Sequence, residues 1–168
     1  MKTIIFVRHA EAILLSKNPS GFDFDREISE NGKKDINIIA NKVKNILIKP
    51  DVIISSTAMR SLQTAEIFAR ILSFSENEII KEMQIYEVGY SFIKNFIANL
   101  DNNINSLMIF GHNPDMLSLS VYYSGMLIDD FPTCGVLCID FENNDWEKIT
   151  ETNGQVRFFE YPKKNYND

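Results

Sequence analysis

The sequence predicts an α/β protein, a three-layer α/β/α sandwich with a mostly parallel central sheet and antiparallel C-terminal strands. Apolar runs of strand length alternate with segments of helical period over most of the chain, an order typical of βαβ units. The last part instead contains strand-like runs separated by turn sequences, which indicate antiparallel pairing. The 168 residues suit one domain, so we expect a single domain over residues 1–168, with a frayed tail over residues 162–168.

The first elements follow from the spacing of apolar residues. Residues 4–7 form an almost continuous apolar run, which is typical of a strand covered on both faces. Apolar residues recur at spacings of three and four over residues 36–47 and indicate an amphipathic helix. We expect a second buried strand over residues 51–55, and then a second helix from an N-cap at Ser56 or Thr57.

The middle of the chain continues this alternation. A short third strand is expected over residues 78–81, a third helix over residues 92–100 and another strand over residues 107–110. Asn113 is a favourable N-cap and Pro114 suits the first helical position, so the next helix should begin there.

Three strands are expected in the C-terminal part, over residues 134–141, 146–152 and 155–161. Residues 143–145 supply the first turn between them. Residues 153–154, Asn-Gly, supply the second turn and are a strong hairpin signal. These strands should therefore pair antiparallel.

Cys134 and Cys138 are the only cysteines, and they lie on one face of a predicted strand. Four residues of extended chain hold them too far apart for a disulfide. No further cysteine and no nearby histidine completes a zinc-binding set. We expect two buried thiols, no disulfide and no metal site.

Charge and hydropathy exclude several classes of partner. The formal net charge of -6 argues against a general nucleic-acid surface, because binding to the phosphate backbone normally needs a basic face. No apolar run approaches the length needed to cross a bilayer, and Arg8 and His9 interrupt the N-terminal run too early for a signal peptide. We expect a cytoplasmic protein without nucleic-acid or membrane partners, as a monomer or weak dimer.

The chain contains only two histidines, His9 and His112, and each directly follows a predicted strand. Ligands of open α/β sheets bind beyond the carboxyl ends of the strands, so both imidazoles are expected at one site. Arg8 beside the first histidine makes an anion the expected ligand. The strand-to-helix junction at residues 55–60 should open on the same edge of the sheet.

Four blocks in this order resemble the histidine phosphatase superfamily, and the lack of any long insertion makes the chain most similar to its SixA-type branch. The blocks are Val7-Arg8-His9-Ala10-Glu11; Arg26 with Ser29 and Gly32; Ser55-Ser56 with Ala58, Arg60, Gln63 and Thr64; and Gly111-His112-Asn113-Pro114. The similarity runs from the first strand to about Phe141. The commonest signature of the superfamily is Arg-His-Gly, and in this chain Ala10 stands in place of the glycine.

The resemblance implies a metal-independent phosphatase that uses no cofactor and forms a covalent phosphohistidine on His9. It implies a site of two arginines and two histidines, which here are Arg8, His9, Arg60 and His112. A neutral imidazole can attack phosphorus. Arginine forks bind phosphoryl oxygens in pairs, which lysine cannot do, and a protonated His112 would add a third donor.

Three further residues are weaker candidates. Arg26 and Ser16 are candidate phosphate contacts, but Arg26 is equally well placed for ion pairs with its acidic neighbours. Glu87 is the candidate proton donor to the leaving group, although a phosphohistidine needs little protonation to release its imidazole. Its competitors are Glu82, Glu11 and Asp115.

The favoured substrate is a protein phosphohistidine, and a small phosphomonoester is the alternative. A non-catalytic phosphate-binding module is the other functional class, but it would not require a nucleophile. Without the family pattern, Arg60 reads as a solvated helix charge and His112 as a cap of its helix.

Overall fold

The computed structural model describes residues 1–47, 49–150 and 152–162. All six strands that it contains join one sheet in the order β3-β2-β4-β1-β5-β6. Strands β1 to β4 run parallel to one another, and β5 pairs antiparallel with both β1 and β6. The strands are β1 (Lys2–Arg8), β2 (Val52–Ser56), β3 (Ile80–Glu82), β4 (Ser106–Gly111), β5 (Val136–Phe141) and β6 (Gln155–Glu160).

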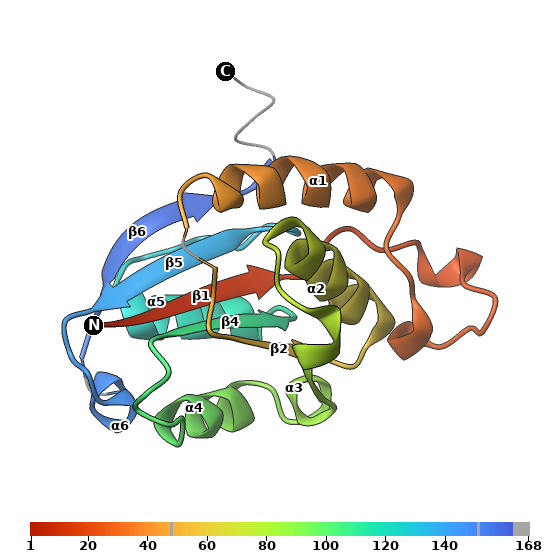
Figure 1. The fold of residues 1–168 in the computed structure, drawn as a ribbon. Coiled ribbons are helices and arrows are strands. Elements are labelled where there is room, and N and C mark those ends of the chain that lie inside the picture. The colour runs from red at the N-terminus through yellow and green to blue at the C-terminus, as the bar shows by residue number, and fades with distance from the viewer. Residues whose placement is uncertain (48, 151, 163–168) are drawn as a thin grey trace.

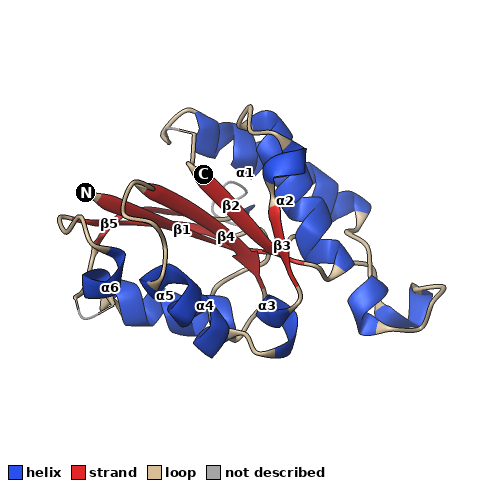
Figure 2. Ribbon diagram, turned by 60° about the horizontal axis from the view of Figure 1, so that its bottom comes forward, coloured by secondary structure: helices blue, strands red, loops and turns tan. Residues whose placement is uncertain are grey.

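Helices cover both faces of this sheet (Figures 1 and 2). One face carries α1 (Glu30–Lys44) and α2 (Met59–Ile71). The other carries α3 (Gln84–Glu87), α4 (Tyr90–Ala98), α5 (Asp115–Ser124) and α6 (Trp146–Ile149). The predicted three-layer α/β/α architecture, with its mostly parallel sheet and antiparallel C-terminal strands, is confirmed.

Burial on both faces explains the continuous apolar run of β1. Ile5 and Val7 belong to the core under α1 and α2, whereas Ile4 and Phe6 belong to the opposite core. Successive side chains of a strand point to opposite faces, so a doubly covered strand needs an apolar residue at every position.

The sheet register brings three strand ends to one edge. Arg8 of β1 lies opposite Gly111 of β4, and Phe110 lies opposite Ser55 of β2. The residues that follow β1, β2 and β4 therefore start from neighbouring points, as the sequence predicted. None of the helices in the described part of the chain is long and apolar enough to span a membrane.

Three boundaries in the parallel half differ from the prediction. Strand β3 begins at Ile80, two residues late, because a 3-10 turn (Glu76–Glu78) precedes it. Helix α2 has Ala58 at its N-cap without a side-chain cap; Ser56 instead ends β2. Helix α5 begins at Asp115, and the predicted cap Asn113 donates its side-chain N–H to the Phe131 carbonyl.

The C-terminal prediction was wrong over residues 146–149, where helix α6 takes the place of the strand expected over residues 146–152; residue 151 lies outside the described residues. Asp145 caps this helix by accepting a hydrogen bond from the Glu147 backbone N–H. Trp146 is fully buried, and its indole N–H donates to the Ile104 carbonyl. Since a helix separates β5 from β6, the Asn-Gly hairpin predicted at residues 153–154 does not form.

The expected strand over residues 134–141 begins two residues late, because Cys134 has a left-handed φ of 58°. Cys134 and Cys138 are both buried in the core under α1 and α2, as predicted. The tail predicted to be frayed lies outside the described residues except for Pro162, which is buried.

Candidate active site

His9 directly follows β1, and its ring orientation is fixed by the backbone. Nδ1 lies 2.7 Å from the Ala10 carbonyl oxygen, so this nitrogen carries the proton and donates it. Nε2 is left as the acceptor. Burial is the main cause that lowers the pKa of His9 to about 4; the Ala10 hydrogen bond opposes it, and the charges of Arg60, Arg8 and Arg26 reinforce it. At pH 7 His9 is therefore a neutral imidazole whose lone pair lies on Nε2.

Arg60 lies in the first turn of α2 and is only 6% exposed, so the solvated-charge interpretation is wrong. Its Nε donates to Nε2 of His9 at 3.2 Å. Its two terminal nitrogens donate to Asp23, Nη1 to the backbone carbonyl at 2.6 Å and Nη2 to Oδ2 at 2.9 Å. The guanidinium thus bridges the candidate nucleophile and an acidic residue.

Arg8 ends β1 and donates from Nη1 to the Phe131 carbonyl at 2.7 Å. Its Nε is buried and has no hydrogen-bond partner within the described residues. A buried cationic donor without a partner is costly, and an incoming anion would satisfy it.

His112 follows β4, and its ring packs against that of His9 with 5.1 Å between the centroids. Ser56 Oγ accepts from the Ala58 backbone N–H at 3.2 Å and lies 2.9 Å from His112 Nε2, and we assign its hydroxyl proton to this nitrogen. The proton of a neutral His112 then sits on Nδ1, a buried atom that lacks a partner in the described part of the chain. The side chain does not cap α5.

Burial, with His9 and Arg60 as further causes, lowers the pKa of His112 to about 3, although the Asp23 carboxylate opposes this. The free protein therefore holds His112 neutral at pH 7. The sequence prediction considered a protonated donor here; in this geometry the neutral ring still offers one N–H, from Nδ1.

The low histidine pKa values give a direct prediction. In a histidine-ring NMR titration at 25 °C, both rings should remain neutral from pH 8 down to about pH 5, and His9 should titrate near pH 4. Since the chain has two histidines, a His112→Asn variant leaves only the His9 signal. A midpoint near the ordinary value of about 6.5 would contradict the buried, cation-flanked geometry.

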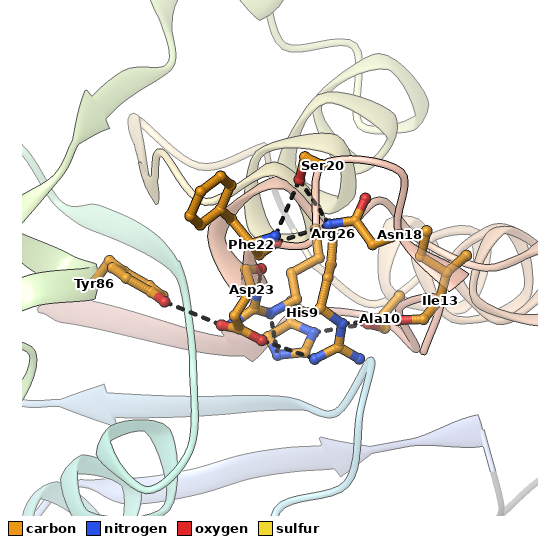
Figure 3. Close-up of polar contacts among 10 residues, drawn as sticks. His9, Ala10, Ile13, Asn18, Ser20, Phe22, Asp23, Arg26 and Tyr86 are labelled. Atoms are coloured by element: carbon orange, nitrogen blue, oxygen red, sulfur yellow. Dashed lines mark hydrogen bonds and ion pairs between the residues drawn. The ribbon is translucent and has the colours of Figure 1, made fainter. Parts of the chain in front are cut away.

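Asp23 and Tyr86 join this cluster and were not predicted as site residues. The Asp23 carboxylate accepts from Arg26 Nη1 and from the Tyr86 hydroxyl, at 2.9 and 3.0 Å, in addition to Arg60 (Figure 3). Burial alone would raise the pKa of Asp23, but the Arg26, Arg60 and Tyr86 contacts lower it to about 2. The edge of Tyr86 packs on His112 with 5.4 Å between ring centroids.

Arg26 lies next to the cluster mainly as an ion-pair partner. It donates from Nη1 to Asp23 and from Nε to the Ile13 carbonyl at 2.8 Å. The ion-pair alternative raised from the sequence is therefore what the structure contains, and the phosphate contact stays a prediction. The one sequence signal for Asp23 was its position three residues before Arg26.

The structure does not bring Ser16 or Glu87 into the cluster. Ser16 is exposed in a 3-10 turn (Leu15–Lys17), and Glu87 is exposed at the end of α3. Within the described ranges neither side chain makes a hydrogen bond or ion pair with Arg8, His9, Arg60 or His112, so both roles stay predictions. Two competitors of Glu87 are engaged elsewhere, Glu11 with Ser29 and Asp115 with the Tyr90 backbone.

The cluster suits an oxyanion better than a cation. Two guanidinium groups and two imidazoles converge on it, and the described residues contain no group of three or more acidic, histidine or cysteine side chains that could hold a metal ion. Buried Nε of Arg8 and Nδ1 of His112 supply donors for the oxygens of a tetrahedral anion.

Comparisons with known proteins agree with this chemistry. The profile of the histidine phosphatase superfamily (branch 1) matches residues 4–96, more than half of the chain. No curated protein matches the sequence significantly. A solved structure from Agrobacterium tumefaciens that carries the name SixA is 27% identical and has a TM-score of 0.80, with 96% of this chain and 98% of that chain covered.

Two more distant structures share the fold. A SixA protein from Nakamurella multipartitia is 16% identical over 96% of each chain, with a TM-score of 0.79. The structure of the protein histidine phosphatase SixA complexed with tungstate is 17% identical, covers 97% of this chain and 99% of its own, and has a TM-score of 0.76. The predicted likeness to the SixA-type branch is confirmed, and the predicted enzyme class, a phosphatase, agrees with it. By its sequence profile and its fold, the chain belongs to the histidine phosphatase superfamily.

Proposed function

We propose that this protein is a metal-independent protein phosphohistidine phosphatase that passes the phosphoryl group through Nε2 of His9. The observation that carries the proposal is the half-buried, neutral His9, whose Nδ1 proton is donated to the Ala10 carbonyl and whose Nε2 faces Arg60. A module that only binds phosphate needs donors. It has no use for an imidazole held in the nucleophilic tautomer.

The first step is a displacement at phosphorus. The Nε2 lone pair of His9 forms the new P–N bond while the bond from phosphorus to the leaving group breaks, and the leaving nitrogen or oxygen takes a proton. Negative charge spreads over the three equatorial oxygens in transfer. In this proposal Arg8, Arg60 and the Nδ1–H of His112 donate to these oxygens and stabilise the transition state. The buried, unpartnered Nε of Arg8 and Nδ1 of His112 support two of these roles.

The second step returns His9 to its starting form. A water attacks the phosphorus of phospho-His9 and gives up one proton to solvent, the P–N bond breaks, and its electron pair returns to Nε2 as inorganic phosphate leaves. The hydrogen bond from Nδ1 to Ala10 persists through both steps and keeps the ring in place. Splitting one hydrolysis into two displacements on the same nucleophile lowers each barrier.

A protein substrate is favoured over a small phosphomonoester for two reasons. The relative that is 27% identical carries the name SixA, the branch whose resemblance implies a protein phosphohistidine substrate. Exposed apolar side chains also flank the site residues in the chain, Phe22 beside Asp23, and Met83 and Val88 on either side of Tyr86. A phosphoprotein would cover such a rim, whereas a sugar phosphate would leave it in water.

The experiment that tests the proposal is trapping during turnover by an alkaline detergent quench, which preserves phosphohistidine. Enzyme treated with chelator and mixed with a 32P-labelled phosphohistidine protein should accumulate an acid-labile, base-stable label on His9 and release phosphate. The same enzyme should turn over p-nitrophenyl phosphate and sugar phosphates with a kcat/KM at least about 100-fold lower, because each lacks the protein contacts. Activity lost on chelation would contradict metal independence, and turnover without any labelled enzyme would contradict the covalent step.

A further inference from the structure

The carboxylate of Asp23 occupies donors that a substrate phosphoryl group needs. It accepts from Arg60 Nη2 and the Tyr86 hydroxyl on Oδ2, and from Arg26 Nη1 on Oδ1, all at 2.9 to 3.0 Å (Figure 3). Its backbone carbonyl takes Arg60 Nη1 as well. Arg60 therefore already binds an anion, the Asp23 carboxylate of the same chain.

This contact also reaches the nucleophile. The guanidinium is a rigid planar fork, so holding both Nη atoms fixes the direction of Nε. That Nε–H points at His9 Nε2, 3.2 Å away, and takes up the lone pair that would attack phosphorus. While Asp23 holds Arg60, the phosphate site is filled and the attacking nitrogen is engaged.

We propose that Asp23 is an internal competitor of the substrate phosphoryl group, and that its carboxylate must leave Arg60 before a phosphoryl group can bind between Arg60 and His9. The inference rests on the proposed roles of His9 and Arg60. A dianionic phosphoryl group competes for Arg60 better than the singly charged Asp23 carboxylate does, so it can displace that carboxylate. The cost of this displacement lowers the affinity of the site for the phosphoryl group.

The position of Asp23 makes this exchange physically reasonable. It lies in a 3-10 turn (Asp23–Asp25) of the long segment between β1 and α1. The base of that segment is tied by the Ile13 N–H donating to the Glu27 carbonyl at 2.9 Å. The Asp23 side chain is 42% exposed against 7% for Arg60, so water can solvate the carboxylate once it is released. A partly exposed ion pair is worth little net free energy, and its exchange is correspondingly easy.

The test is the binding of inorganic phosphate, measured by isothermal titration calorimetry on the full chain. Asp23→Asn keeps the size of the side chain and removes its charge. Phosphate should then bind about five- to tenfold more tightly, because the carboxylate no longer occupies Arg60 in part of the protein population. With a phosphohistidine protein, KM should fall by a similar factor.

Asp25→Asn is the matched control, because it removes the same charge from the same turn. The Asp25 side chain makes no hydrogen bond or ion pair with Arg60. Its phosphate affinity should change by less than about twofold. An equal gain in both variants would overturn the inference, because it would show a general charge effect.

A weaker or unchanged phosphate affinity in Asp23→Asn and Asp23→Ala would also overturn the inference, because it would show that Asp23 instead positions Arg60 for the anion. Binding of phosphate requires no turnover, so this outcome is separable from the proposed function. Tighter phosphate binding by Asp23→Asn, without phosphatase activity in the parent protein, would contradict the proposed function alone. Catalysis through phospho-His9, without tighter phosphate binding by the variant, would contradict only the competitor role of Asp23.

Discussion

Replacing His9 by alanine should lower kcat for phosphohistidine hydrolysis by about 10⁴-fold or more, the range seen when a covalent nucleophile is removed. No other side chain can take its place: His112 is engaged through Nε2 with Ser56 and offers only its Nδ1 proton. Rapid-quench kinetics with a 32P-labelled substrate would measure the loss and the absence of a labelled enzyme together.

Two controls separate this chemical effect from a folding defect. His9→Asn, which is closer in size and polarity, should be equally inactive and should unfold within a few degrees of the parent. Both variants should still bind inorganic phosphate within about tenfold of the parent, because Arg8, Arg60 and His112 supply most of the donors. Hydrolysis by either variant at a tenth of the parent rate would remove His9 as the nucleophile.

The sequence predicted the part of this site that depends on sheet topology. His9, His112 and the segment containing Arg60 each follow a parallel strand, and parallel strands end at a common edge, so their meeting did not depend on loop geometry. Asp23 and Tyr86 could not be predicted in this way. One lies in a long loop that folds back over the strand ends, and the other lies on a four-residue helix after β3.

The errors at the C-terminus have a similar cause. Residues 146–149 are too few for helical periodicity to show, and Trp146 favours a strand by intrinsic preference. Burial of its ring, with its indole N–H on the Ile104 carbonyl, decides the local structure instead. That contact joins residues 42 positions apart and leaves no local signal. The Asp145 cap was the available clue, because aspartate before a short apolar segment is typical of a helix start.

Replacing Arg60 by alanine is the second large effect, and kcat/KM should fall by about 10³-fold. The change removes a fork that faces the oxygens where charge develops in the transition state, and a single such donor is commonly worth about 10²- to 10³-fold. Arg60→Lys should recover little of the loss, because one ammonium cannot reproduce the planar, bidentate donation of a guanidinium to phosphoryl oxygens. The pKa of His9 should rise in Arg60→Ala, since a neighbouring positive charge that lowers it is lost.

Arg70→Ala is the matched control for the Arg60 prediction, because Arg70 lies on the same helix but is exposed and paired with Glu76. It should change kcat/KM by less than about twofold, and an Arg60→Ala enzyme within fivefold of the parent would contradict the assigned role. A double-mutant cycle then links Arg60 to Asp23. If the Asp23 carboxylate and phosphate compete for Arg60, the gain in phosphate affinity caused by Asp23→Asn should largely vanish in the Arg60→Ala background. If Asp23 acts only as a nearby negative charge, the same gain should persist there.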